Sequence, residues 1–150
     1  DVLLRYGAER VAAVDVGYGQ LVWRLRQDPR VLVLERTNFK LLGEGVVPWE
    51  SDVITCDASF IGLSRLLPVI VRELRLGGVF VGLVKPQFEL AREDVPAGGV
   101  VRDEGLRAKA VEKVASKAEE LGLEVLDATP SPVHGPKGNQ EILLLCRKRR

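Results

Sequence analysis

A single lysine stands at an unusual place in this chain of 150 residues, directly after a run that is typical of a buried strand. The run is VFVGLV, residues 79–84, and Lys85-Pro86 follows it at once. Such an apolar strand is typical of a sheet covered on both faces, where lysine is rarely found. Pro86 cannot donate to a ladder and favours an extended Lys85, so the strand should end there. Ligands bind at this edge of open α/β sheets, so Lys85 is a candidate for chemistry; a lysine that extends its amine into water is the alternative.

Two carboxylates are predicted at the same edge of the sheet. Asp57 follows a strand expected over residues 52–56, and Glu141 lies at the start of the final strand, expected over 140–146. Only a loop separates the last two strands, so they should pair antiparallel, and an antiparallel strand presents its first residues where a parallel one presents its last. A lysine between two carboxylates can be a plain salt-bridge cluster, or its free amine can act on a hydroxyl group. The carboxylates would hold the lysine but favour its charged form, which a nearby bound cation would oppose.

A further carboxylate, Asp15, closes the first apolar strand, expected over residues 10–16. α/β folds use an acid at this position to accept hydrogen bonds from both hydroxyls of a ribose. The glycines at 17 and 19 follow the acid, whereas the glycine-rich turn of nicotinamide-binding folds precedes it. An ordinary strand-end aspartate remains the alternative, and a nicotinamide-binding fold is a weaker one.

The predicted elements alternate between strands and helices, which favours a doubly wound, mostly parallel α/β sheet with a terminal antiparallel strand. Helices are expected over residues 20–27, 61–74 and 103–121, and the remaining strands over 31–34 and 124–127. The length fits one domain, and the net charge of +1 indicates neither a nucleic acid nor a membrane as partner. The two cysteines have no metal-ligand spacing, so we expect free thiols, no metal and a reducing compartment. Without a signal peptide or a membrane-length apolar run, we expect a cytoplasmic protein.

Several strings of the sequence resemble one family. They are VDVGYGQL (14–21), LRQDPRV (25–31), ERTN (35–38), DASFI (57–61), VKPQFE (84–89), GGVVRD (98–103), SP (131–132) and GN (138–139). In this order they are similar to the TlyA family, whose members carry the name haemolysin and resemble the FtsJ-like ribosomal RNA 2′-O-methyltransferases. The similarity extends over nearly all of the chain.

This resemblance implies S-adenosylmethionine as the methyl donor and a ribose 2′-hydroxyl of ribosomal RNA as the acceptor. The FtsJ-like enzymes use a Lys-Asp-Lys-Glu tetrad, and Asp57, Lys85 and Glu141 match its last three members by position. Lys85 is then expected to assist removal of the hydroxyl proton while the oxygen attacks the methyl carbon in line. Asp57 and Glu141 are expected to orient the lysine and the ribose.

The same resemblance assigns residues to the donor. Asp15 is expected to hold its ribose, with Val16 beside it, and Asn38 to lie near the adenine. Asp57 is expected close to the methionine end.

Other residues are candidates for contact with RNA. Arg92 and Arg102 belong to a loop that could close over the site as a flap, and Asn139 follows a second loop; a solvated loop is the alternative for the arginines. Phe60 and Phe88 each lie three residues past a catalytic candidate and are candidates for base stacking or for the core.

The sequence also departs from the family. The family's first lysine, its first strand and the glycine-rich turn that grips the donor would precede residue 1, as would the usual small RNA-binding domain. In the family's strand order, 3-2-1-4-5-7-6, the missing strand is central, so strands 2 and 4 have no shared neighbour. We therefore expect residues 1–150 to be a partial FtsJ-like methyltransferase domain that binds the donor poorly and is inactive alone.

Two other functions remain open from the sequence. A membrane-active haemolysin is suggested by the family's name, although the helix expected over 103–121 balances its charges and is not a basic amphipathic helix. A degenerate module that binds RNA without catalysis is the second alternative. The sequence does not indicate the oligomeric state or the target nucleotide.

Overall fold

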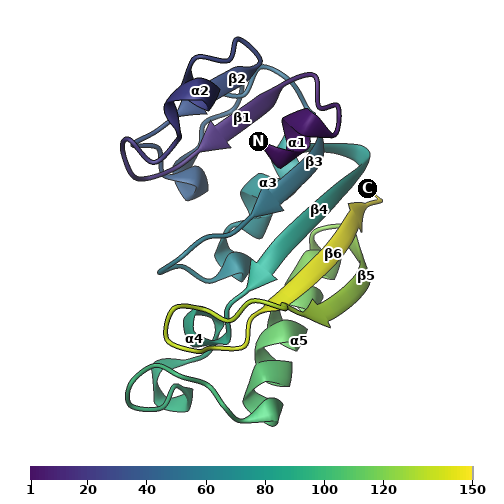
Figure 1. Ribbon diagram of the computed structural model, residues 1–150. Helices are drawn as coiled ribbons and strands as arrows, with labels where there is room; N and C mark the ends of the chain where they lie inside the picture. The colour runs from purple at the N-terminus through teal and green to yellow at the C-terminus, as the bar shows by residue number, and fades with distance from the viewer. Residues whose placement is uncertain (150) are drawn as a thin grey trace. The chain divides into compact units, whose positions relative to one another are not determined.

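The computed structural model describes residues 1–149, and the chain divides into two compact units, Asp1–Trp49 and Glu50–Arg150. The first unit contains α1 (Val2–Arg5), β1 (Val11–Val14), α2 (Trp23–Arg26), β2 (Val31–Leu34) and the short 3₁₀ helix η1 (Phe39–Leu41). Strands β1 and β2 pair in parallel, with Val11 opposite Val31 and Val14 opposite Leu34 (Figure 1). All residues of both strands are half-buried.

The second unit is built around a four-stranded sheet. Its elements are β3 (Ser51–Cys56), η2 (Leu63–Arg65), α3 (Leu67–Glu73), β4 (Leu74–Val84), α4 (Pro86–Glu89), η3 (Arg92–Asp94), α5 (Glu104–Glu120), β5 (Leu123–Pro130) and β6 (Ile142–Lys148). The strand order is β3-β4-β6-β5; β3 and β4 are parallel, and β6 is antiparallel to both of its neighbours (Figure 1). The mixed α/β fold and the antiparallel pair at the end of the chain confirm the predictions.

The two observed sheets correspond to two pieces of the strand order that the family resemblance implies. If the first strand is removed from the family's order 3-2-1-4-5-7-6, the pieces 3-2 and 4-5-7-6 remain. In chain order these are the observed sheets β2-β1 and β3-β4-β6-β5. Within residues 1–149, β1 pairs only with β2 and β3 only with β4.

The core of the second unit lies on one face of its sheet. Alternate residues of β4 and β6 are fully buried, among them Phe80, Val84 and Leu144. Helices α3 and α5 contribute the buried side chains of Ile70 and Val114. The intervening residues of β4, Val79, Val81 and Leu83, are only half-buried. The sequence predicted a strand buried on both faces, but β4 is fully buried on one face only.

One glycine of β4 is required by this packing. A Cβ atom at Gly82 would lie 2.4 Å from Cζ of Phe80 and 2.6 Å from Cδ2 of Leu63. These distances are shorter than any ordinary contact, so a larger residue would displace the centre of the core.

Several element bounds differ from the sequence prediction. The helix expected over 61–74 divides into η2 and α3, with Pro68 in the first turn of α3, where a missing N–H costs nothing. Strand β4 begins at Leu74, before the glycine turn at Gly77, and β6 begins at Ile142 and leaves Glu141 just outside it. Helix α2 has only four residues, and β1 is shorter than expected.

Helix α5 follows the prediction closely. Asp103 caps its first turn by accepting a hydrogen bond from the Leu106 N–H at 2.8 Å. Gly122, in the left-handed region at φ +89°, follows its end. In the part of the chain that the structure describes, no helix combines the length and the apolar character needed to cross a bilayer.

Candidate active site

Lys85 lies at the junction between β4 and α4. It has the extended conformation that Pro86 favours, with φ −111° and ψ 101°, and Pro86 begins the helix. Lys85 is 8% exposed, yet its Nζ is 2.7 Å from Oδ1 of Asp57 and donates a hydrogen bond to Oγ of Ser59 at 3.1 Å. Because 71% of the Asp57 side chain is exposed, the ion pair joins a buried amine to a carboxylate that solvent or a ligand can reach.

Glu141 reaches the same edge through the register of β4 and β6. Val84 is opposite Ile142, so Lys85 and Glu141 are the next residues beyond that pair on the two strands. Glu141 is 5% exposed and accepts a long hydrogen bond, 3.4 Å, from Nε2 of Gln87. Within residues 1–149 there is no ion pair between Lys85 and Glu141, so Asp57 is the carboxylate that contacts the amine.

The Glu141 carboxylate is closely enclosed. A Cβ atom at Gly135 would lie 2.7 Å from its Oε1, so the loop before β6 approaches it more closely than a side chain would allow. Oε1 of Gln87, on the other side of the amide that contacts Glu141, is buried and has no hydrogen-bond partner among the described residues.

Cys56 precedes Asp57 and does not compete with Lys85 for a role in chemistry. Burial, reinforced by the charge of Asp57, raises the pKa of the Cys56 thiol to about 11. The thiol is therefore neutral near pH 7 and is a poor nucleophile there.

The loop after Asp57 carries two further features of the site. Phe60 is 92% exposed, and its backbone is in the left-handed region at φ 65°, which is rare for a bulky residue. Its ring centroid lies 5.6 Å from that of Phe88 on α4, with the rings inclined at 47°. Ser59, just before it, binds Lys85 and was not singled out from the sequence; its place in the DASFI string, two residues after the acid, is the only signal of it.

The residues expected to contact RNA occupy different environments. Arg92, in η3, and Arg102 are exposed, whereas Asn139 is 3% exposed. Oδ1 of Asn139 accepts from the Val101 N–H at 2.9 Å, and Nδ2 donates to the Gly99 carbonyl at 2.8 Å. The Asn139 amide thus joins the loop that contains Arg92 and Arg102 to the segment before Glu141, and a contact of Asn139 itself with RNA stays a prediction.

The residues expected to bind the donor's adenosine belong to the first unit. Asp15 follows β1 and is exposed; its Oδ1 accepts from the Gly17 N–H at 2.6 Å. Val16 is 71% exposed, so its apolar side chain is accessible to a ligand. Asn38 is exposed and caps η1 by accepting from the Lys40 N–H at 3.1 Å.

The loops that carry Asp15 and Asn38 are joined by backbone hydrogen bonds. The Thr37 N–H donates to the Asp15 carbonyl at 2.9 Å, and the Asp15 N–H donates to the Leu34 carbonyl at 3.0 Å. The loops that carry Asp15 and Asn38 therefore leave the carboxyl ends of β1 and β2 together.

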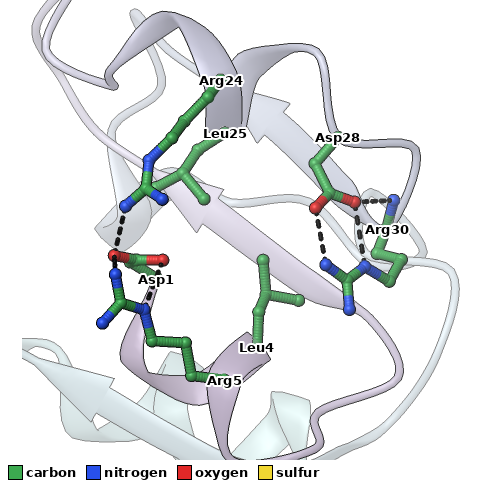
Figure 2. A pocket seen from close by; sticks show the side chains of 7 residues that line it. All are labelled: Asp1, Leu4, Arg5, Arg24, Leu25, Asp28 and Arg30. Carbon is green, nitrogen blue, oxygen red and sulfur yellow. Dashed lines mark hydrogen bonds and ion pairs between the residues drawn. The ribbon is translucent and has the colours of Figure 1, made fainter.

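A pocket of about 320 Å³ in the first unit contains none of these residues. Figure 2 shows that its charges are paired: Asp1 binds Arg5 and Arg24, and Asp28 binds Arg30. The hydrogen bond from Arg30 lowers the pKa of the Asp28 carboxyl to about 2, so this pair stays ionised. The arginines of the pocket are already partnered by acids, so the pocket offers an anion little unpaired charge.

Comparison with known proteins decides the family. The family described as FtsJ-like methyltransferase matches residues 1–149. The chain belongs to this family. The resemblance predicted from the sequence strings is thereby confirmed, and an FtsJ-like methyltransferase domain accounts for the mixed α/β fold.

Individual relatives agree with this assignment. The chain is 48% identical over 147 residues to "16S/23S rRNA (cytidine-2'-O)-methyltransferase TlyA" of Mycobacterium tuberculosis, covering 98% of this chain and 55% of that protein. It is 42% identical over 144 residues to "Hemolysin A" of Brachyspira hyodysenteriae, covering 95% of this chain and 60% of the relative. The solved structure "Putative hemolysin from Streptococcus thermophilus" superposes with a TM-score of 0.94 at 41% identity, covering 99% of this chain and 54% of that one. This FtsJ-like chain thus spans little more than half the length of the relatives that it matches.

Proposed function

We propose that the protein to which these residues belong is an S-adenosylmethionine-dependent methyltransferase that acts on a ribose 2′-hydroxyl of ribosomal RNA. The observation that carries the proposal is the buried amine of Lys85, held 2.7 Å from Asp57 at the edge of the sheet in an FtsJ-like chain. The relative from Mycobacterium tuberculosis carries the name of that activity. We also propose a cytoplasmic location, because ribosomal RNA as substrate would be met there.

Lys85 acts in this proposal as the group that receives the hydroxyl proton. The donor, when bound, supplies a methyl group on a positively charged sulfur. The 2′-oxygen forms a bond to the methyl carbon, the carbon–sulfur bond breaks, and the proton passes to Nζ of Lys85. The step starts from the neutral amine, which the positive charge of the bound donor would favour over the ammonium. The ammonium that the transfer forms is stabilised by Asp57, whose Oδ1 lies 2.7 Å from Nζ. A positioned general base of this kind contributes roughly 10²–10⁴-fold to a rate.

The remaining predicted residues take roles that suit their environments. The exposed carboxylate of Asp15 and the exposed apolar surface of Val16 suit a ribose diol and an adenine face. Asn38 has an exposed side chain on the loop that is hydrogen-bonded to theirs. We assign these three to the adenosine of the donor and Asp57 also to its methionine end. Glu141 orients the acceptor ribose.

RNA contact is assigned to the loops around this edge. Arg92 and Arg102 are exposed and can bind phosphates, whereas Asn139 holds their loop. Phe60 is the exposed ring nearest in sequence to the Asp57–Lys85 pair and suits stacking on a base.

Methyl transfer from labelled S-adenosylmethionine to ribosomal RNA, measured with the full-length protein, tests the proposal. Lys85→Met should lower the rate roughly 10²–10⁴-fold because the proton acceptor is lost, while calorimetry shows the donor still binding. Lys117→Met is the matched control, since Nζ of Lys117 forms an ion pair of 2.8 Å with Glu120 on the surface of α5. A Lys85→Met protein that keeps its rate within about threefold of the control contradicts the proposal.

We also propose that residues 1–150 are a partial domain and are inactive by themselves. Calorimetry with S-adenosylmethionine should then show weak binding or none, and the RNA should remain unmethylated. Donor-dependent methylation by these residues alone would refute this part of the proposal and leave the assignment of Lys85 intact.

A further inference from the structure

Ser59 is the one contact of the Lys85 amine to which no role has been given. Within residues 1–149, Nζ forms an ion pair with Oδ1 of Asp57 at 2.7 Å and donates a hydrogen bond to Oγ of Ser59 at 3.1 Å. Lys85 is 8% exposed, so its amine has little direct contact with water. The environment of the amine is therefore set mainly by these two side chains.

The two contacts together determine where the lone pair of a neutral amine points. A neutral lysine amine has two N–H bonds and one lone pair, arranged tetrahedrally with the bond to Cε. The carboxylate of Asp57 and the hydroxyl of Ser59 can each accept one N–H, which leaves the third direction for the lone pair. With Asp57 alone, only one N–H direction would be fixed, and the lone pair could occupy either of the two remaining positions.

The same arrangement suits the amine after it has taken up a proton. The ammonium ion has three N–H bonds, and Asp57 and Ser59 keep the two that they already accept. The third N–H is the one formed in the reaction, along the direction of the former lone pair. Neither side chain has to move during the transfer, which is a feature of preorganised sites.

The loop that carries Ser59 is anchored at two places after Ser59 to α4, the helix that follows Lys85. The ring of Phe60 packs against Phe88 of α4. Further along, Ser64 donates from its N–H and its Oγ to the buried carboxylate of Glu89, at 3.1 and 2.8 Å. The left-handed backbone at Phe60, φ 65°, is a costly conformation that these contacts maintain.

We propose that Ser59 is a positioning residue that orients the Lys85 amine for proton transfer from the ribose hydroxyl. This inference rests on the proposed function, because it assumes that Lys85 is the proton acceptor. Its chemistry requires the hydroxyl group and not merely the volume of the side chain, so threonine should replace serine and alanine should not.

Single-turnover methyl transfer by the full-length protein, with donor and RNA saturating and the pH varied, tests the role of Ser59. Ser59→Ala should lower the plateau rate roughly 10- to 100-fold, as expected when a hydrogen bond to a charged group is lost. The midpoint of its pH–rate profile should move to lower pH, because the hydroxyl no longer stabilises the ammonium form. Ser59→Thr should restore both the rate and the midpoint.

Ser64→Ala is the matched control, since it removes a serine hydroxyl that anchors the same loop without contacting Lys85. It should lower the unfolding temperature and leave the pH midpoint in place. Ser59 is exposed, so Ser59→Ala should fold, which circular dichroism verifies.

The outcomes separate this inference from the proposed function. If Lys85→Met is inactive but Ser59→Ala keeps its rate and midpoint, the inference is overturned and the proposed function stands. If Ser59→Ala and Ser64→Ala lose rate equally and neither midpoint moves, Ser59 only supports the loop, and the inference is likewise overturned. If Lys85→Met remains active, both fail.

Discussion

The two compact units of the chain differ in how completely their sheets are paired. In the first unit β1 and β2 pair only with each other among the described residues, and each of their residues is half-buried. In the second unit β4 and β6 each have a strand on both sides, and Phe80 and Leu144 are fully buried. Two-stranded sheets are marginally stable in water, whereas wider sheets with a covered face can be stable independently.

The predicted functional residues are divided between the same two units. Asp57, Lys85 and Glu141 all belong to the second unit, where the register of β4 and β6 holds the lysine and the glutamate. The predicted adenosine residues, Asp15 among them, belong to the first unit and are exposed. Groups that transfer a proton need a geometry held to fractions of an ångström, so a well-packed sheet is the better place for them.

A pair of core substitutions should show the largest contrast between the units. Phe80→Ala removes a ring with no exposed surface and should lower the free energy of unfolding by about 3–5 kcal/mol. Val33→Ala, in the half-buried β2, should cost only about 1 kcal/mol, because less surface is removed from water on folding there. Urea denaturation followed by circular dichroism measures both. Equal losses would mean that the first unit is as tightly packed as the second.

A pair of asparagines provides a contrast of intermediate size. Asn139→Ala leaves the buried N–H of Val101 without its acceptor and should cost about 2 kcal/mol. Asn38→Ala removes an exposed cap from η1, where water replaces the lost acceptor, and should cost about 0.5 kcal/mol. Thermal unfolding of both variants checks the difference. A cost at Asn139 no larger than at Asn38 would show that its link to the loop of Arg92 is not made in solution.

The features of the second unit that could be predicted from sequence are those that depend on local rules. Pro86 ends β4 before Lys85, Asp103 caps α5, and the connection between β5 and β6 contains only a loop, which favours antiparallel pairing. That antiparallel pairing puts Glu141 at the edge where Lys85 lies, so the two groups could be placed together from topology alone.

The contacts that sequence did not predict join loops far apart in the chain. Ser59 and Lys85 are 26 residues apart, and Val101 and Asn139 are 38 apart. No periodicity or turn rule relates such positions, because their hydrogen bonds depend on how the loops at the sheet edge pack. For the same reason the sequence did not predict that β1 is less buried than β4. Both strands are apolar runs, and only their neighbours in space distinguish them.

The smallest contrast concerns backbone strain, since within residues 1–149 each unit holds one residue other than glycine in the left-handed region. These residues are Arg36 at φ 52° and Phe60 at φ 65°. Replacement by glycine relieves about 1–2 kcal/mol of steric cost but gives back about 0.5–1 kcal/mol through the flexibility of the unfolded chain. These two terms favour Phe60→Gly by about 0–1.5 kcal/mol, and the lost contact with the Phe88 ring reduces that gain, so we expect a small net stabilisation of the second unit. Arg36→Gly should be close to neutral, because Arg36 also stacks 4.5 Å from the ring centre of Tyr18 and loses that contact.

Whether Phe60→Gly raises or lowers the stability of the protein distinguishes backbone strain that is kept for function from strain that the fold requires. If Phe60→Gly raises the unfolding temperature and lowers methyl transfer to RNA, the exposed ring is held in a costly conformation because it contacts substrate. If the substitution lowers the unfolding temperature, the contact between Phe60 and Phe88 stabilises the loop by more than the strain costs, and the exposed ring needs no functional explanation. Arg36→Gly, measured in parallel, provides the baseline for a strained residue outside the second unit.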